Sequence, residues 1–161
     1  MGGKEIRIRS ARADDADALV PIWQEMALQH ETYDDLRWGF REGASEIWHG
    51  FFVESLQREK SIALVAADEA DRPVGYLLAE TREPPPVMAV RCRGHVWDIC
   101  VTQQYRRRGI GRRLLKRATE EMRARGADYV TLGVAVANEA ARGFYESLGL
   151  RPVTHEMLMR L

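Results

Sequence analysis

The chain has 161 residues, of which 30% are charged and 45% hydrophobic, and its 24 basic residues balance its 24 acidic residues. This length fits one domain with a substantial core, so we expect residues 1–161 to form a single domain. A formal net charge of zero gives no long-range attraction to nucleic acid or to an anionic membrane, so we expect neither as a partner.

The N-terminal third predicts one strand and two helices. Residues Ile6–Arg9 alternate apolar and polar side chains, which is typical of a short strand with one buried face. Acidic residues at 14, 15 and 17 favour the start of a helix with apolar residues at helical spacing from Leu19 to Met26. Pro21 lies inside this pattern, so the regular helix should begin near Asp17 or bend at the proline. A second helix is predicted over Ser45–Arg58.

The middle of the chain predicts a hairpin and a further strand. Residues Ser61–Ala67 and Val74–Glu80 have the pattern of two strands joined by the polar turn Asp68–Pro73. Prolines at 84, 85 and 86 cannot donate to a strand ladder, so they indicate a stiff loop. The apolar run Val96–Val101 then predicts the next strand.

The C-terminal part predicts helices that alternate with strands. Residues Ile110–Arg125 carry their apolar side chains on one face, as an amphipathic helix does. The apolar run Tyr129–Val136 predicts a long strand, parallel to Val96–Val101 because a helical crossover joins the two. A short helix, Glu139–Leu148, and a closing strand, Pro152–Leu161, complete the predicted chain.

Cysteine and histidine usage predicts a cytoplasmic protein without a metal. Cys92 and Cys100 are the only cysteines and form no C-x-x-C motif, and the four histidines lack the spacing of metal ligands. The first residues lack the apolar core of a signal peptide, and no apolar run approaches the ~20 residues of a membrane span. We therefore expect reduced cysteines in the cytoplasm.

The segment Gln104–Arg113 has the composition of an anion-binding turn. It follows a predicted strand and opens into a predicted helix. Gly109 and Gly111 tolerate positive φ and lack the β-carbons that would keep a phosphate away from the backbone. The helix presents unpaired N–H groups and the positive end of its dipole at the same place. A turn with a solvated basic face would explain the segment equally well if it stood alone.

With its downstream residues, this segment resembles the GCN5-related N-acetyltransferase (GNAT) superfamily, and the resemblance is best over residues 94–150. The residues that carry it stand in the order Arg106-x-x-Gly109-x-Gly111, Asn138 and Phe144-Tyr145. The resemblance implies an α+β (mixed α/β) fold. In that fold a mixed, mostly antiparallel sheet has helices on both faces, and one parallel pair of strands splays apart.

The resemblance also implies an activity. It indicates an acyl-CoA-dependent N-acetyltransferase that moves an acetyl group from acetyl-CoA to a primary amine of a small molecule or protein by direct attack. A catalytically silent acyl-CoA-binding regulatory module of the same fold is the alternative, and the presence of Asn138 and Tyr145 favours activity. Small amines, polyamines, amino acids, aminoglycosides and protein amines all stay open as acceptors. What is common among similar proteins favours a homodimer.

The resemblance assigns roles toward coenzyme A. The turn would hold the pyrophosphate, a strand edge would bind the pantetheine arm, and Asn138 would form a hydrogen bond with that arm. Tyr145 would protonate the leaving thiolate, because a tyrosine with an ordinary pKa near 10 is protonated at neutral pH. The expected cofactor-binding residues are Ile99, Cys100, Val101, Arg106, Arg107, Arg108, Gly109, Ile110, Gly111, Arg112, Asn138 and Tyr145.

Asp98 is the first candidate for the general base that an ammonium acceptor requires. It precedes the pantetheine-binding residues on the same strand, and a buried carboxylate is costly without partners. A structural carboxylate that positions a water or caps an amide is the alternative role, and Glu80 and His95 are the next candidates for the base.

The resemblance also implies that the connection between the two N-terminal helices covers the acceptor side of the cleft. His30, Tyr33 and Trp38 are candidate acceptor contacts there, together with Glu80. Aromatic residues at helical spacing fit a core at least as well as a binding wall.

Two other classes of protein fail on detail. A dinucleotide-binding fold requires a third glycine at a fixed spacing after Gly109 and Gly111, and that glycine is missing. Nucleic-acid binding would rest only on the local arginines, which the phosphates of coenzyme A explain better in a chain without net charge.

Overall fold

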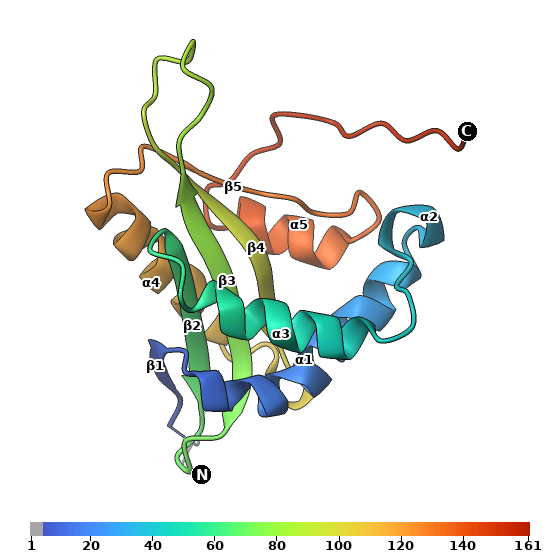
Figure 1. Cartoon of the computed structure of the whole chain (residues 1–161), viewed down its shortest axis with the longest axis vertical. Helices are drawn as coiled ribbons and strands as arrows, with labels where there is room; N and C mark the ends of the chain where they lie inside the picture. Colours follow the sequence, from blue (N-terminus) through green and yellow to red (C-terminus); the bar gives the residue numbers. More distant parts are fainter. Residues whose placement is uncertain (1–4) are drawn as a thin grey trace.

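The computed structural model describes residues 5–161. Its five-stranded sheet has the order β1-β2-β3-β4-β5 (Figure 1); the first four strands are antiparallel neighbours, and β5 is parallel to β4. The strands are β1 Arg7–Ser10, β2 Ser61–Ala67, β3 Pro73–Arg82, β4 Arg93–Val101 and β5 Val130–Leu132. The helices are α1 Ala16–Glu31, α2 Asp35–Trp38, α3 Ala44–Ser55, α4 Ile110–Ala124 and α5 Glu139–Glu146, with short 3-10 turns η1 Ala13–Asp15 and η2 Gln103–Tyr105.

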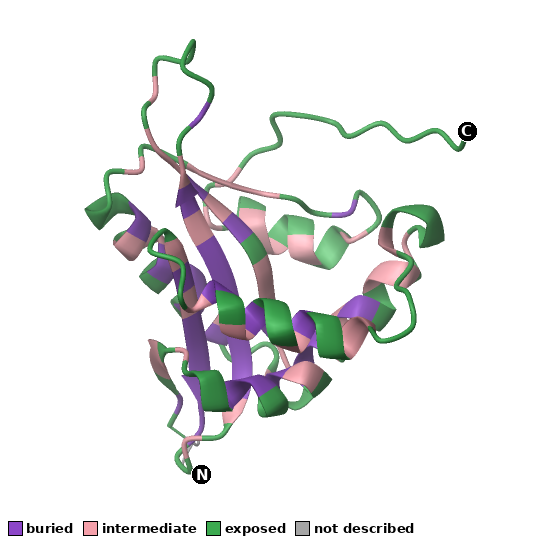
Figure 2. Ribbon diagram, in the orientation of Figure 1, coloured by how far each residue is buried: buried purple, intermediate pink, exposed green. Residues whose placement is uncertain are grey.

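Helices cover both faces of the sheet, and each face has its own core. On one face, Trp23 of α1 and Trp48 and Phe52 of α3 pack with Tyr76 of β3. On the other face, α4 buries its apolar stripe, and Figure 2 shows the buried residues concentrated along β2 and β3 between these layers. The stripe consists of Ile110, Leu114, Leu115, Ala118 and Met122. The predicted fold class, a mixed and mostly antiparallel sheet with helices on both faces, is confirmed.

The observed helices agree with the sequence pattern to within a few residues. α1 begins at Ala16, directly after η1, and includes Pro21, so the helix starts where the acidic residues predicted. α3 spans Ala44–Ser55 and ends three residues before the predicted limit. α4 ends at Ala124, followed by Gly126 with φ of 85°, a left-handed conformation that glycine adopts without strain.

β4 contains an extra residue that bends it. The register between β3 and β4 shifts between Leu78, opposite Asp98, and Ala79, opposite Val96, so Trp97 has no partner in β3. One unpaired residue of this kind is a β-bulge, which bends its strand and increases the local twist. The sequence pattern did not reveal this bulge.

The parallel pair of strands separates immediately beside the bulge. β5 pairs with β4 only at Gly94–Val96, whereas β4 continues to Val101. The prediction of a long strand over Tyr129–Val136 is therefore wrong in length, because its partner bends away after three residues. The splayed parallel pair that the resemblance implied is confirmed, and it leaves one edge of β4 open.

The C-terminal segment, residues 151–161, forms no strand. All of its residues are exposed (Figure 2). The segment runs from the end of α5 toward α2 (Figure 1), where Arg37 and Glu156 form an ion pair of 2.9 Å. The prediction of a closing strand over Pro152–Leu161 is wrong for the single chain, since no neighbouring strand lies beside this segment to complete a ladder.

Two further properties bear on function. Within residues 5–161, no helix is both long and apolar enough to cross a membrane. Cys92 and Cys100 are free thiols, and the described chain holds no group of three side chains suited to a metal ion.

Candidate active site

The turn before α4 presents a run of backbone N–H groups. Gly109 caps the helix with φ of 74°, and Arg107 also has a positive φ of 64°. Among the hydrogen bonds of residues 5–161, none uses the backbone N–H groups of residues 107–112, whereas the N–H of Arg113 donates to the carbonyl of Gly109. Unpaired amides at the positive end of a helix dipole form an anion-binding site.

The two glycines of this turn have different surroundings. A β-carbon at Gly109 would meet no heavy atom within 4 Å, so the space in front of the turn is open. A β-carbon at Gly111 would lie 3.4 Å from Cζ of Phe144, so this glycine allows α5 to approach α4. Gly109 thus keeps the turn accessible to a ligand, and Gly111 allows α5 to pack closely against the start of α4.

Side chains around the turn hold its shape. The guanidinium of Arg106 donates from Nε to the carbonyl of Val101 at 2.9 Å and from Nη2 to Glu25 at 3.3 Å. The guanidinium of Arg108 lies 5.0 Å from the ring centroid of Tyr105. Arg106 therefore ties the turn to β4 and α1 and has a structural role in addition to its predicted place in the cofactor site.

The open edge of β4 carries the three strand residues predicted to bind the coenzyme. Ile99, Cys100 and Val101 pair with β3 on one side, and β5 has already separated on the other. The Cys100 thiol donates to the carbonyl of Ile22 at 3.3 Å, and burial raises its pKa to about 12. Cys100 is therefore a protonated core residue at neutral pH, and only its backbone can serve the site.

Two functional candidates lie at the two ends of α5. Asn138 is its N-cap, and the side-chain oxygen accepts from the N–H of Ala141 at 3.1 Å, which leaves the amide nitrogen to donate to a ligand. Tyr145 is half-buried against the α4 core. Burial, reinforced by the charge of Asp98, raises the pKa of Tyr145 to about 12. The Tyr145 hydroxyl is thus protonated throughout the neutral range.

Asp98 lies on the face of the sheet that α1 and α3 cover. Its Oδ2 accepts from Nε1 of Trp48 and from the hydroxyl of Tyr76, each at 3.3 Å. Burial raises the pKa of this carboxyl, and the two hydrogen bonds oppose the rise because they favour the charged form. Sequence reasoning missed Trp48 and Tyr76 as partners, because the helical spacing of one and the strand pattern of the other indicated only core packing.

The predicted acceptor residues fall into two groups. His30, Tyr33 and Trp38 form one aromatic cluster, with ring centroids of Tyr33 and Trp38 lying 5.7 and 5.5 Å from that of His30. His30 Nδ1 lies 2.8 Å from the carbonyl of Met26, which fixes the ring at the end of α1. The structure thus brings these three residues together where α1 meets α2.

Glu80 belongs to a second cluster beside the bulge. It pairs with His95 across β3 and β4 and forms an ion pair with Arg82. The Arg82 guanidinium lies 4.3 Å from the ring centroid of Trp97 and the His95 ring 4.6 Å from it. Burial, followed by the charge of Arg82, lowers the pKa of His95, which favours a neutral imidazole.

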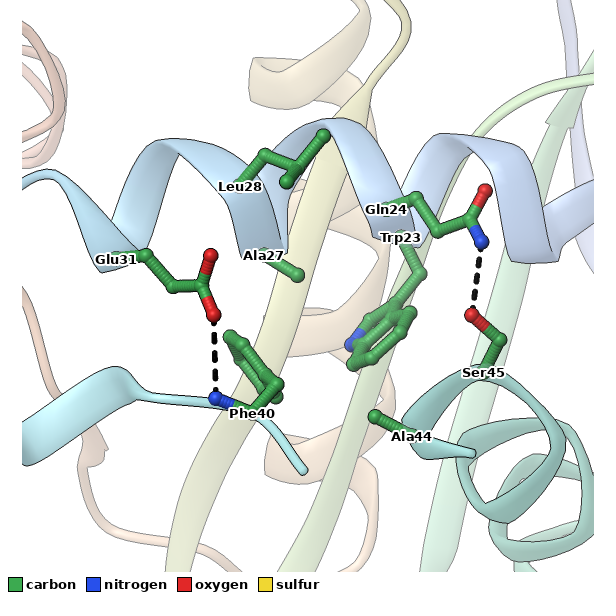
Figure 3. A pocket seen from close by; sticks show the side chains of 8 residues that line it. All are labelled: Trp23, Gln24, Ala27, Leu28, Glu31, Phe40, Ala44 and Ser45. Carbon is green, nitrogen blue, oxygen red and sulfur yellow. Dashed lines mark hydrogen bonds between the residues drawn. The ribbon is translucent and has the colours of Figure 1, made fainter. Parts of the chain in front are cut away.

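One hollow lies outside both clusters. It has a volume of about 360 Å³ and opens between α1 and the segment that leads into α3 (Figure 3). Its ends are tied by Glu31, which accepts from the N–H of Phe40 at 3.2 Å, and by Gln24, which donates to Ser45 at 2.8 Å. Its lining is Trp23, Gln24, Ala27, Leu28, Glu31, Phe40, Ala44 and Ser45, which includes no residue predicted for the site.

Known proteins have sequences similar to this chain. Residues 23–150 match the acetyltransferase (GNAT) family. An N-alpha-acetyltransferase of Sulfurisphaera tokodaii is 33% identical over 159 residues, which cover 94% of this chain and 83% of that protein. A mycothiol acetyltransferase of Beutenbergia cavernae is 35% identical over 153 residues, which cover 95% of this chain and 44% of that protein.

Solved structures agree with the fold. A protein of Bacillus halodurans is 27% identical and superposes with a TM-score of 0.85, covering 96% of this chain and 99% of that chain. An aminoglycoside N-acetyltransferase in complex with CoA shares the fold with a TM-score of 0.74 at 14% identity. Both comparisons extend over nearly the whole described chain.

Proposed function

Because this chain belongs to the acetyltransferase (GNAT) family and is an acyl-CoA-dependent N-acetyltransferase, we propose that its acceptor is the α-amino group of a peptide or protein. Coenzyme binding is supported by one observation: β4 and β5 separate after three paired residues, and this fork lies beside the turn before α4 with its unpaired amides. The acceptor part is supported by the relationship to the N-alpha-acetyltransferase of Sulfurisphaera tokodaii.

The residues of the fork fit coenzyme A. The amides of residues 107–112 supply the donors that a pyrophosphate requires, and the open space at Gly109 admits it. The free edge of Ile99–Val101 offers backbone groups to a peptide-like pantetheine arm, as an added strand would use them. The Nδ2 amide of Asn138 can donate to the same arm. When bound, the coenzyme supplies the activated acetyl thioester.

The energetics of proton removal favour an α-amine over a lysine. An α-amino group with a pKa near 7.8 costs about 1 kcal/mol to deprotonate at pH 7, whereas a lysine with a pKa near 10.4 costs about 4–5 kcal/mol. A single buried carboxylate can meet the smaller cost. Asp98 is such a group, since burial raises its pKa while Trp48 and Tyr76 hold it in place.

Acid and base catalysis then fall to two residues. Asp98, in its ionised form, accepts the proton of the incoming ammonium, directly or through a water. Tyr145, protonated because its pKa is about 12, donates its proton to the departing thiolate. The charge of Asp98 contributes to the raised pKa of Tyr145. The His30, Tyr33 and Trp38 cluster forms the wall toward the acceptor in this proposal.

The role of the turn before α4 in coenzyme binding can be tested by substituting two glycines that both have a positive φ. We expect Gly109→Val to weaken acetyl-CoA binding by about 10-fold or more, because its β-carbon would enter the open space before the amides. Gly126→Val is the control, since Gly126 also has a positive φ and open surroundings but lies at the opposite end of α4. Both variants should lose similar stability in thermal melts. An unchanged dissociation constant for Gly109→Val in calorimetry would contradict the assignment.

The acceptor class is tested with paired peptides. One peptide carries a free N-terminus and no lysine, and its partner carries a blocked N-terminus and one lysine. We expect acetyl-CoA-dependent mass gain at least about 100-fold faster on the first, in line with the difference in deprotonation cost. Faster acetylation of the lysine peptide would refute the α-amine proposal. Coenzyme binding without transfer to any amine would favour the silent binding module.

A further inference from the structure

Glu25 is an acidic residue of α1 that binds the segment between β4 and α4. Its Oε1 accepts from the hydroxyl of Thr102 at 2.5 Å. Its Oε2 accepts from the N–H of Gln103 at 3.0 Å and from Nη2 of Arg106 at 3.3 Å. Both carboxylate oxygens are therefore bound to residues that lie 77 to 81 positions later in the sequence.

The contact with Gln103 closes the start of the 3-10 turn η2. Thr102 is the N-cap of this turn, but its hydroxyl donates to Glu25 instead of capping. The first N–H of a helical turn has no partner within the turn, and a carboxylate is a strong acceptor for it. Glu25 thus caps η2 from a different helix, which fixes where the turn begins.

η2 leads into a residue with a strained backbone. Arg107 has φ of 64°, which lies in the left-handed region that non-glycine residues rarely adopt. Such a residue keeps this conformation only when its surroundings hold it there. The preceding residue, Arg106, is held on two sides, by the carbonyl of Val101 at 2.9 Å and by Glu25. The main chain therefore enters Arg107 from a fixed position.

We propose that Glu25 is a positioning residue for coenzyme binding, which holds the turn before α4 in the conformation that presents the amides of residues 107–112. In this role Glu25 does not touch the coenzyme. Its side chain is 35% exposed and that of Arg106 is 40% exposed, so water screens their charges and the contact acts mainly through its geometry. The inference rests on the coenzyme site proposed above and is independent of the acceptor.

Calorimetry with acetyl-CoA tests this role. We expect Glu25→Ala to raise the dissociation constant of acetyl-CoA by about 10-fold or more, because the turn loses three hydrogen bonds to one carboxylate. The kcat at saturating acetyl-CoA should change by less than about 3-fold, since bound coenzyme restores the turn. Glu25→Gln should bind acetyl-CoA nearly as the wild type does. Its amide oxygen can accept from Gln103 and Arg106 while its nitrogen donates to Thr102.

The Arg107→Gly background separates positioning from a general loss of stability. Without Glu25, Arg107 can relax to an ordinary φ, and coenzyme binding must then restore the strained conformation. Glycine adopts a positive φ without strain. We therefore expect the weakening caused by Glu25→Ala to shrink from about 10-fold to less than about 3-fold in the Arg107→Gly background, as a double-mutant cycle measures. A carboxylate that only stabilised α1 would weaken binding equally in both backgrounds.

Glu31→Ala is the matched control. Glu31 lies on the same helix and accepts a backbone N–H at 3.2 Å, but from Phe40 and not from the turn. This variant should leave the affinity for acetyl-CoA unchanged.

Three results would overturn the proposal. They are an unchanged dissociation constant for Glu25→Ala, an equal loss with and without Arg107→Gly, and a loss in Glu25→Gln as large as that in Glu25→Ala. If Gly109→Val weakens acetyl-CoA binding and Glu25→Ala does not, the coenzyme site is correct and Glu25 has no part in it. If neither variant weakens binding, the proposed coenzyme site fails together with this role of Glu25.

Discussion

Tyr145→Phe is expected to lower kcat by about 10²- to 10⁴-fold while changing the dissociation constant of acetyl-CoA by less than about 3-fold, the loss typical of removing one general acid. The ring stays in place against the α4 core, so packing is kept and only the hydroxyl is lost. Because burial raises the pKa of Tyr145 to about 12, the hydroxyl is protonated at every pH at which the enzyme is assayed. The thiolate would then leave without a proton donor.

The matched control for this variant is Tyr129→Phe. Tyr129 is exposed just before β5 and outside the proposed cleft, so the loss of its hydroxyl should leave kcat unchanged. Release of coenzyme A, followed with a thiol reagent at saturating substrates, gives kcat. Isothermal calorimetry gives the affinity for acetyl-CoA. A Tyr145→Phe enzyme with normal kcat would remove this residue as the acid, whatever the outcome of the peptide assay.

Asp98→Asn is expected to lower kcat/KM by about 10²- to 10⁴-fold at pH 7 and to remove the acidic limb of the pH–rate profile, as loss of a general base does. In the wild type that limb should lie above the ordinary range of an aspartate near 3.9, because burial raises the pKa of Asp98. Only the ionised carboxylate can accept a proton, so the rate falls as the pH drops through that pKa.

Tyr76→Phe tests in which direction the pKa of Asp98 moves when one of its hydrogen bonds is removed. The Tyr76 hydroxyl donates to Oδ2 and favours the charged carboxylate, so its loss should raise the pKa of Asp98 and move the acidic limb to higher pH. The melting temperature of Asp98→Asn, in contrast, should rise relative to that of the wild type as the pH rises through the pKa of Asp98 in the folded protein, because ionising the buried carboxylate costs stability. That difference should shrink as the pH falls from the pKa of Asp98 in the folded protein, and it should be absent below the pKa near 3.9 of an aspartate in the unfolded chain. If the acidic limb of the pH–rate profile is still present in Asp98→Asn, another group is the general base.

Local sequence patterns predict most elements of this fold. The apolar run Ser61–Ala67 predicts β2 with the observed limits, and the apolar stripe of α4 predicts that helix to within one residue. These elements depend on local propensity and on which face is buried, and residues close together in the sequence determine both properties. The glycine turn before α4 is equally local, so its place at the start of a helix was predictable.

Features that depend on distant partners were not predictable. The apolar run Tyr129–Val136 fits a long strand, yet it pairs over three residues because the bulge at Trp97 bends its partner away. The hydrogen bonds of Asp98 join it to Trp48 and Tyr76, which are 50 and 22 residues away in the sequence. The segment Pro152–Leu161 was predicted to be a strand, but it belongs to no sheet of the described residues.

The coenzyme site described above consists mainly of backbone groups, and this shapes how it tolerates mutation. Replacing Arg107 or Ile110 changes a side chain but leaves the amide that the turn presents. Gly109, with its φ of 74°, is different, because a larger residue there alters the course of the main chain itself. Most positions of this loop should therefore tolerate many different side chains, as long as the main chain keeps its path. Gly109, which sets that path, should tolerate few substitutions.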